Sequence, residues 1–353
     1  MEWSIQPIWR EMGITVITTI QAPTPSLRQM ADAGLRHGLR TIAVGDRKTP
    51  DAEWPDGTDF LSLPDQRKTG YGLADQLPEN HYARKNIGYL LAMSRGAEVI
   101  FDTDDDNAPM LTWKKRGLQV QARPCATKNW VNVYKWFTGE QIWPRGFPLE
   151  QVRSQTTPPE LGVSMVCDAP IQQGLANGSP DVDAIWRLTL DREMTFRDGD
   201  SVLLQAGAWC PFNSQSTWWF PEAYPLMYLP SFVSFRMTDI WRSFIAQRCL
   251  WAQGHGVVFH GPEMFQERNP HNLLRDFEQE IPGYLNNSKI CEVLENLLLS
   301  NKLEDAGANL HRCYDALAAS GFIPSKELAL VESWLVDVSH CASERQKTIG
   351  GAF

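Results

Sequence analysis

The sequence has no excess of basic residues: 33 lysines and arginines stand against 42 aspartates and glutamates, which gives a formal net charge of −9. Nucleic-acid-binding proteins need a basic face, so this balance argues against general nucleic-acid binding. No apolar run approaches the length of a membrane span, and we expect none. Met1–Pro7 also lacks the basic segment and apolar core of a signal peptide.

Paired cysteine motifs are missing as well. The seven cysteines are scattered, odd in number and without a C-x-x-C pair, which argues against a zinc site and against a secreted disulfide framework. Reduced thiols and a cytoplasmic location fit this pattern best. The hydrophobic share of 43% is that of an ordinary globular protein, with one large domain or two. The 14 tryptophans are too many for one ligand site, so most should lie in a core.

Glycine-rich phosphate motifs are absent too. The chain has neither a P-loop nor a G-x-G-x-x-G fingerprint. Gln21–Pro25, which follows the first predicted strand, contains no glycine. This counts against a sugar nucleotidyltransferase, which would carry a glycine-rich loop there.

The first hundred residues predict alternating strands and helices. Thr24 and Pro25 suit an N-cap and a first helical position, and Gly38 suits the end of that helix. Such alternation implies an α/β fold with a parallel sheet, in which ligands bind at the carboxyl ends of the strands. We predict strands over 13–20, 39–44, 59–63 and 98–101, and helices over 25–37 and 80–95.

Four carboxylates follow the last of these strands within five positions: Asp102, Asp104, Asp105 and Asp106. Because they repel one another, a hard divalent cation, Mg²⁺ or Mn²⁺, is the simplest relief, with substrate phosphates as further ligands. A solvated acidic loop is the alternative. Asp46 also ends a strand, so two strands indicate the same site.

The helix ahead of the acidic run begins with two cations, Arg84 and Lys85, although cations in a first turn oppose the helix dipole. They either face a pyrophosphate held at the strand ends or form a solvated basic turn. Gly88, inside this helix, costs about 1 kcal/mol relative to alanine. Close approach of the helix to a neighbouring strand or ligand would explain a glycine at this position. Its presence by chance is the alternative.

These segments resemble a known family. Arg84–Gly88 together with Gly96–Asp105 is similar to the R-x-N-x-G … D-x-D-D stretch of GT-A glycosyltransferases, and more closely to the STELLO family of glycosyltransferase-like proteins, which are related to the reversibly glycosylated polypeptides. Three further segments look like that family: 43–50, 180–184 and 241–251. The matches follow in order along residues 13–265.

The resemblance implies a GT-A fold, a Rossmann-like mixed sheet flanked by helices, whose first half binds a nucleotide sugar and whose second half binds the acceptor. Thr18 and Thr19 would line the base pocket, Asp46 would contact the uracil or ribose, and Arg84 and Lys85 would approach the ribose or phosphates. The metal would sit on the acidic cluster, where both Asp102-x-Asp104 and Asp104-x-Asp106 satisfy D-x-D. We favour Asp104 and Asp106 nearest the metal, with Asp105 in the same cluster and Asp102 supporting.

An inverting enzyme also needs a base, and Asp239 at a predicted helix start is the candidate, with an N-cap as the alternative. His260 could complete the metal shell from the second half of the chain, although a structural role is more usual for such a histidine. Arg242 and Arg248 should point to different helix faces, and one of them should meet a phosphate or a carboxylate sugar.

Two acceptor-side features complete the predicted site. Asp181 and Asp183 either bind acceptor or form a turn before a strand over 184–190. Trp218 and Trp219 either stack on a sugar ring or pack in the core. The Pro- and Trp-rich segment 107–180 is expected to be insertion and loop around the acceptor site.

We predict a catalytic domain over 1–284, with a nucleotide half at 13–110 and an acceptor half at 111–284, and an all-α extension over 285–353. The extension should pack on the catalytic domain or mediate assembly, as an oligomer or with a partner glycosyltransferase. The predicted function is a metal-dependent, inverting glycosyltransferase that takes a nucleoside-diphosphate sugar, UDP favoured, and a glycan acceptor in cell-surface polysaccharide synthesis. The alternatives are a sugar nucleotidyltransferase and a non-catalytic scaffold on the same fold.

Overall fold

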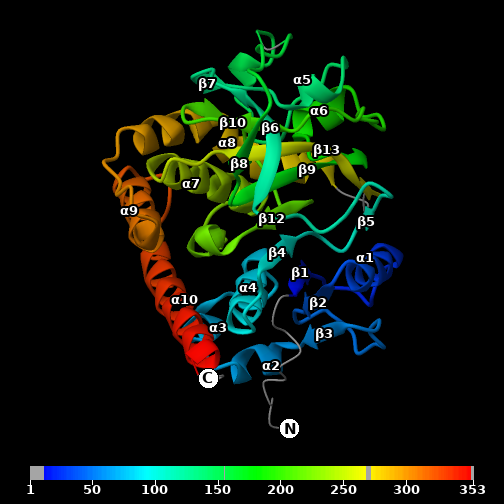
Figure 1. The fold of residues 1–353 in the computed structure, drawn as a ribbon, viewed down its shortest axis with the longest axis vertical. Coiled ribbons are helices and arrows are strands. Elements are labelled where there is room, and N and C mark those ends of the chain that lie inside the picture. The colour runs from blue at the N-terminus through cyan, green and yellow to red at the C-terminus, as the bar shows by residue number, and fades with distance from the viewer. Residues whose placement is uncertain (1–11, 155, 268–271, 351–353) are drawn as a thin grey trace.

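The computed structural model describes residues 12–154, 156–267 and 272–350 (Figure 1). The segment behind the signal-peptide expectation lies outside these residues. Eleven described strands form one mixed sheet in the order β3-β2-β1-β4-β12-β9-β13-β10-β6-β8, with β5 paired to β13, and β11 pairs separately with β7. The strands are β1 Gly13–Thr18, β2 Leu39–Val44, β3 Thr58–Leu61, β4 Val99–Asp102, β5 Asn107–Pro109, β6 Gln119–Cys125, β7 Asn129–Trp130, β8 Met165–Asp168, β9 Ile171–Gly178, β10 Val202–Leu204, β11 Ala208–Trp209, β12 Thr217–Trp219 and β13 Val257–Gln266.

Helices lie on both sides of this sheet (Figure 1). The α-helices are α1 Pro25–Arg36, α2 Leu63–Lys68, α3 Gly72–Gln76, α4 Lys85–Ser94, α5 Tyr134–Phe137, α6 Ala184–Thr189, α7 Thr238–Ala252, α8 Leu273–Glu295, α9 Ala306–Ala319 and α10 Glu327–Gly350. Short 3₁₀ turns are η2 Tyr82–Arg84, η3 Leu149–Gln151, η4 Pro221–Met227, η5 Phe235–Met237 and η6 Leu303–Asp305.

The N-terminal half follows the predicted alternation closely. β1 lies between β2 and β4, all parallel, so their carboxyl ends share one edge of the sheet. Thr24 caps α1 by accepting from Leu27 N at 3.0 Å, and Pro25 is its first residue. Gly88 of α4 lies against β1 and β2, where an added Cβ would come within 2.6 Å of methyl carbons of Val16 and Val44. Close approach to two strands therefore explains this mid-helix glycine.

The second half is more ordered than predicted. Segment 107–180, expected to be mostly loop, contributes strands to the sheet, and β12 pairs antiparallel with both β4 and β9 at its centre. The predicted strand over 184–190 is wrong, because Ala184–Thr189 is the helix α6, capped by Asp183. The apolar residues of this short segment misled the prediction, since a strand and a buried helical turn share such a pattern.

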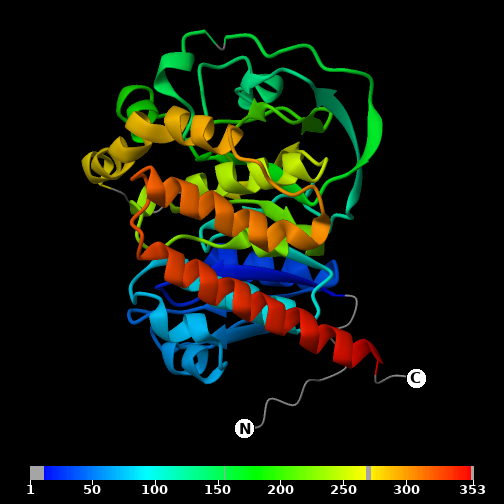
Figure 2. The same ribbon diagram turned by 90° about the vertical axis from the view of Figure 1, so that its left-hand side faces the viewer.

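The C-terminal helices α8, α9 and α10 lie one below the other along one side of the molecule (Figure 2). The expected boundary at 284 falls inside the continuous helix α8. α10 contacts α3 and α4 in the N-terminal part of the chain, and α9 contacts α7 and α8 in the C-terminal part, so this segment bridges both parts. No helix within the described ranges combines the length and the apolar character that crossing a membrane requires.

Candidate functional site

The acidic run lies at the carboxyl edge of the sheet, in the turn between β4 and β5. Asp102 is the last residue of β4 and is fully buried, whereas Asp104, Asp105 and Asp106 are partly exposed in the turn. Asp102 pairs in the sheet with Val16 of β1 and with Thr217 of β12. The buried end of the strand thus fixes where the exposed carboxylates emerge.

Asp102 is held between two buried cations. Lys85 Nζ lies 2.7 Å from Asp102 Oδ1, and Arg242 Nη2 lies 3.0 Å from Asp102 Oδ2. Burial alone would lower the pKa of Lys85, but the charges of Asp102 and Asp104 outweigh it and raise that pKa. Arg242, from α7, also lies 5.0 Å from the ring centre of Trp219. Each carboxylate oxygen of Asp102 therefore lies against one buried cation.

Asp104 faces outward from this pair. Its Oδ1 accepts from Lys85 Nζ and from the hydroxyl of Tyr82, each at 2.9 Å. Within the described part of the chain, no donor contacts its Oδ2. Burial raises the pKa of the Asp104 carboxyl, an effect that Lys85 partly opposes.

Asp105 and Asp106 have different hydrogen-bond partners from Asp104. Thr19 donates to Asp105 Oδ2 at 2.5 Å, and Thr24 donates to the backbone oxygen of Asp105. Gln266 of β13 donates to Asp106 Oδ2 at 2.9 Å. Burial, and next the charge of Asp104, raise the pKa of Asp106 to about 7. The three exposed carboxylates thus sit where their ionised forms are poorly compensated.

The side chains around the acidic turn supply part of the coordination shell that a divalent cation needs. Among the described residues, no group of three or more histidine, cysteine, aspartate or glutamate side chains surrounds one point as a metal site would. The chain alone therefore offers no complete shell. Mg²⁺ and Mn²⁺ accept one or two carboxylates when substrate phosphates and water supply the remaining oxygens. The turn fits that second type of site.

Of the residues predicted to contact the nucleotide, Thr18 and Thr19 lie beside the acidic turn, whereas Asp46 binds backbone groups of the chain. Thr18 ends β1 and Thr19 follows it, beside the acidic turn. Asp46 follows β2, but its carboxylate accepts from the backbone N–H groups of Arg47, Asn80 and His81. It therefore anchors the turn that leads into η2.

Arg84 is buried, and its guanidinium binds other parts of the chain. It is 2% exposed and donates to Gln66 Oε1 at 2.6 Å and to the carbonyls of Leu77 and Ala74. Asn86 is equally internal, since its amide exchanges two hydrogen bonds with the backbone of Leu229. The R-x-N-x-G motif here thus joins α4 to its neighbours, and only Lys85 reaches the acidic turn.

The candidate base Asp239 lies in the first turn of α7 and is bound by a guanidinium that sequence reasoning missed. Arg145 donates to Asp239 Oδ1 at 3.0 Å and Oδ2 at 2.8 Å, and also binds both oxygens of Asp181. Burial would raise the pKa of Asp239, but Arg145 lowers it. Asp239 is thus no N-cap side chain: no side-chain hydrogen bond caps α7.

A chain of amides connects this ion triad to the acidic turn. Gln215 accepts from Asp181 N at 3.1 Å and donates to Gln266 Oε1 at 2.6 Å, and Gln266 donates to Asp106. Nothing in the sequence singles out Gln215 or Gln266, because each becomes informative only through its partners in space. Tyr82 was missed for the same reason.

His260 lies apart from the acidic turn. Its Nδ1 is 2.7 Å from Ser201 Oγ and its Nε2 is 3.0 Å from Gln172 Oε1. Burial, and next the charge of Arg116, place its pKa well below the usual value. Since both ring nitrogens are occupied by other side chains, this arrangement leaves none for a metal.

The expected acceptor residues are also internal. Trp218 and Trp219 are both 0% exposed within β12, so neither presents a face to a sugar here. Asp183 accepts from Trp186 N at 2.8 Å as the N-cap of α6 and from Trp143 Nε1 at 2.6 Å. In the structure Trp218 and Trp219 pack in the core and Asp183 caps α6, so none of the three is placed for contact with a sugar.

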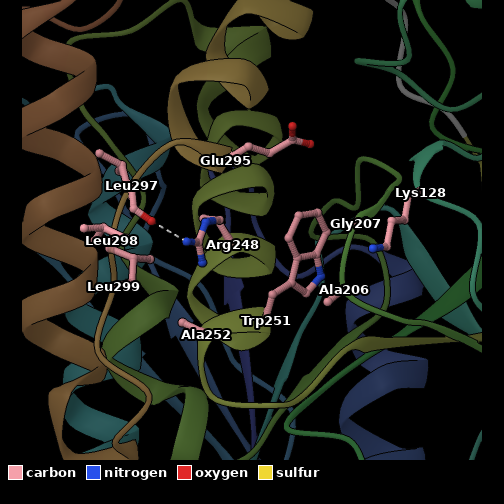
Figure 3. Close-up of a pocket in the computed structure, with 10 residues that line it drawn as sticks. All are labelled: Lys128, Ala206, Gly207, Arg248, Trp251, Ala252, Glu295, Leu297, Leu298 and Leu299. Atoms are coloured by element: carbon pink, nitrogen blue, oxygen red, sulfur yellow. Dashed lines mark hydrogen bonds between the residues drawn. The ribbon is translucent and has the colours of Figure 1, made fainter.

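Arg248 lines a separate cavity of about 440 Å³ between α7, the end of α8 and the β10–β11 turn (Figure 3). Its guanidinium donates to the carbonyls of Leu294 and Leu297, and thus satisfies the C-terminal end of α8. Trp251 and Lys128 border the same cavity. Arg242 and Arg248 do point to different places, but Arg248 contacts backbone and not the acidic turn.

Comparison with known proteins agrees with the motif resemblance. The family model described as STELLO glycosyltransferases matches residues 236–353, which include α7, β13 and the C-terminal helices. Two Arabidopsis thaliana proteins, "Probable glycosyltransferase STELLO1" and "Probable glycosyltransferase STELLO2", are each 28% identical over 92% of this chain. The chain spans 44% of the length of each.

A solved structure, "Crystal Structure of a Mycobacterial Protein", aligns with 92% of this chain and 81% of its own at a TM-score of 0.36 and 9% identity, too low to assign a fold. The resemblance read from the motifs is thus confirmed by the sequence comparisons, and this chain is similar to the STELLO glycosyltransferases along most of its length.

Proposed function

We propose that this protein is a metal-dependent glycosyltransferase that uses a nucleoside-diphosphate sugar, with UDP favoured, and a glycan acceptor. The observation that supports it most is the charge balance of the acidic turn. Four carboxylates, of Asp102, Asp104, Asp105 and Asp106, have two cations in direct contact, Lys85 and Arg242. The remaining excess of negative charge lies on the partly exposed side, where a divalent cation would offset it.

Asp104 and Asp106 would hold the cation, and Asp102 would support them by fixing Lys85. When bound, Mg²⁺ or Mn²⁺ would stabilise the charge that develops on a nucleoside diphosphate leaving group. Tyr82 and Gln266 would orient the two carboxylates, since each donates to one of their oxygens. Thr19 would hold Asp105 beside the end of β1.

For an inverting reaction Asp239 is the proposed base. Its carboxylate would accept the proton of the acceptor hydroxyl, which requires one oxygen to exchange its hydrogen bond with Arg145 for one with the acceptor. Arg145 would keep the carboxylate ionised in the meantime, since its charge lowers the Asp239 pKa. We propose cell-surface polysaccharide synthesis as the setting, on the strength of the family resemblance alone.

Calorimetric titration tests the donor site. Purified protein is titrated with UDP, CDP and GDP, with and without Mn²⁺, alongside Asp104→Ala and Asp106→Ala. Binding of one nucleotide that requires Mn²⁺ and is lost in both variants supports the proposal. Asp32→Ala, at an exposed position of α1, is the matched control and should bind as wild type does. Absence of binding by all three nucleotides would refute the donor site.

Turnover then separates the alternatives. Release of nucleoside diphosphate from the donor marks a glycosyltransferase, whereas pyrophosphate release marks a sugar nucleotidyltransferase. Metal-dependent binding without any turnover marks a scaffold. Asp239→Asn should retain nucleotide binding and lose transfer to the acceptor if Asp239 is the base.

A further inference from the structure

The aromatic ring of Phe235 is exposed near the acidic turn. Phe235, the first residue of η5, is 49% exposed. Its ring centre lies 6.1 Å from that of His81 and 6.0 Å from that of Tyr82, both in edge-to-face geometry. We call these three residues the aromatic shelf. Its Tyr82 donates to Asp104, so the shelf is continuous with the proposed metal ligands.

The shelf is held in place from both sides. Its neighbours in the chain are anchored: Ser234 donates to the carbonyl of Gln279, and Arg236 binds Glu280 at 2.9 Å. On the other side, Asp46 holds the backbone N–H of His81 at 3.0 Å. The exposure of Phe235 is therefore fixed by its neighbours and does not come from a loose loop end.

The edge of the shelf carries a hydrogen-bond donor. His81 Nδ1 accepts from Ala83 N at 3.1 Å, which places the proton of a neutral ring on Nε2. Burial lowers the His81 pKa and favours that neutral form. Among the described residues Nε2 has no hydrogen-bond partner. His81 thus offers one donor beside the ring of Phe235.

This chemistry matches a neutral pyranose ring. An apolar C–H face packs on an aromatic ring, and sugar hydroxyls both donate and accept. The adjacent cations Arg84 and Lys85 are 2% and 0% exposed, so neither offers charge to an anionic ligand on the shelf. Phe235 also lies just before α7, whose first turn carries the proposed base Asp239.

We propose that the aromatic shelf is the acceptor subsite, where Phe235 stacks on a sugar ring of the glycan and His81 Nε2 donates to one of its hydroxyls. The inference rests on the proposed function and deepens it. It moves the stacking role from the buried Trp218 and Trp219 to a residue that the sequence did not single out.

The test measures saccharide and nucleotide binding separately. Neutral hexasaccharides of glucose, mannose, galactose and xylose are titrated into protein saturated with UDP and Mn²⁺, and into protein alone, with UDP titrated in parallel. Phe235→Ala should weaken the saccharide that binds wild type by about tenfold, the size expected for one stacked ring. Phe235→Trp should retain it, and Leu274→Ala, at a 72% exposed residue of α8, should have no effect.

Each outcome decides the inference. Unchanged saccharide affinity in Phe235→Ala, or no saccharide bound by wild type, would overturn it. Loss of UDP affinity in that variant, with saccharide binding intact, would assign the ring to the nucleobase and also overturn it. Saccharide binding that depends on Phe235 in a protein that binds no nucleotide would support the shelf and refute the donor site.

Discussion

The carboxylate of Asp102 and the guanidinium of Arg242 lie 3.0 Å apart although 140 residues separate them in sequence. Asp102 belongs to the strand that delivers the acidic turn, and Arg242 belongs to the helix that carries the proposed base. Both side chains are at most 1% exposed. The pair thus joins β4 to α7 at the point where the proposed reaction would occur.

Removal of the Arg242 charge should destabilise the fold strongly. Arg242→Met would leave Asp102 buried with Lys85 as its one remaining cation, and breaking such a pair typically costs about 3–5 kcal/mol. Urea unfolding at neutral pH measures this change. The exposed ion pair of Arg192 and Glu140 gives the control, because Arg192→Met should cost at most about 1 kcal/mol. Equal effects of the two substitutions would show that the buried pair contributes little.

The glycine at position 88 should resist substitution although it lies inside a helix. Alanine there would improve helix propensity by about 1 kcal/mol, but its Cβ would overlap Val16 and Val44. Overpacking of this kind costs about 1–3 kcal/mol, so Gly88→Ala should be net destabilising or neutral at best.

Gly34 of α1 is the matched control for Gly88. An alanine Cβ there would meet its nearest neighbour, the carbonyl oxygen of Leu39, at an ordinary 3.4 Å. Gly34→Ala should therefore be neutral or stabilising by up to about 1 kcal/mol in the same unfolding assay. A stabilising Gly88→Ala would mean that α4 can shift away from the sheet.

How far the sequence predicts this molecule depends on how local each signal is. The helix cap at Thr24, the strand bounds at 39–44 and the acidic turn follow from neighbouring residues, and they agree with the structure. For Trp218, Trp219 and Asp183 the sequence leaves acceptor contact and an internal role both open, because residue type alone does not reveal burial. Burial in β12 arises from pairing with β4 and β9, which lie far away in sequence.

The same limit applies within the candidate site. The roles of Arg145 and Gln266 depend on contacts to residues 94 and 160 positions away, respectively. Arg84 illustrates the opposite error, since its motif position favoured a ligand contact but its donors serve Gln66 and two backbone carbonyls. Sequence indicated where the carboxylates converge; topology determines which cations and amides meet them.

Asp183 should make the stability of the protein depend on pH. Burial raises its pKa from 3.8 to about 7, so between these values the folded protein holds a proton that the unfolded chain has lost. Stability must then fall as pH rises through this window, by at most about 1.4 kcal/mol per pH unit, and level off above it.

Asp183→Asn isolates this contribution, because the amide does not titrate. The difference in unfolding free energy between wild type and variant, measured from pH 5 to pH 8, should shift against wild type with rising pH. The other titrating groups are common to both proteins and cancel. A constant difference across the range would show that the Asp183 carboxyl is ionised throughout, as hydrogen bonds from Trp186 N and Trp143 Nε1 would favour.

The C-terminal helix α10 should contribute to the stability of the preceding residues, because its first residue, Glu327, holds a buried loop before η5. Glu327 accepts from the hydroxyl of Tyr228 at 2.5 Å and from the backbone N–H groups of Ser231 and Phe232. That loop leads into η5 and α7 and is bound on its other side by Asn86 of α4. Glu327→Ala would leave these buried donors unsatisfied, at about 1–3 kcal/mol for each group that water cannot reach.

The exposed Glu332 of the same helix is the matched control, since its side chain is 65% exposed. Glu332→Ala should leave the unfolding midpoint nearly unchanged, whereas Glu327→Ala should lower it clearly. The second readout is Mn²⁺-dependent UDP binding, which should weaken in Glu327→Ala because the loop joins α4, the source of Lys85, to α7, the source of Arg242. If Glu327→Ala unfolds as wild type does and binds UDP equally well, α10 contributes little to the stability of the sheet and to the proposed donor site.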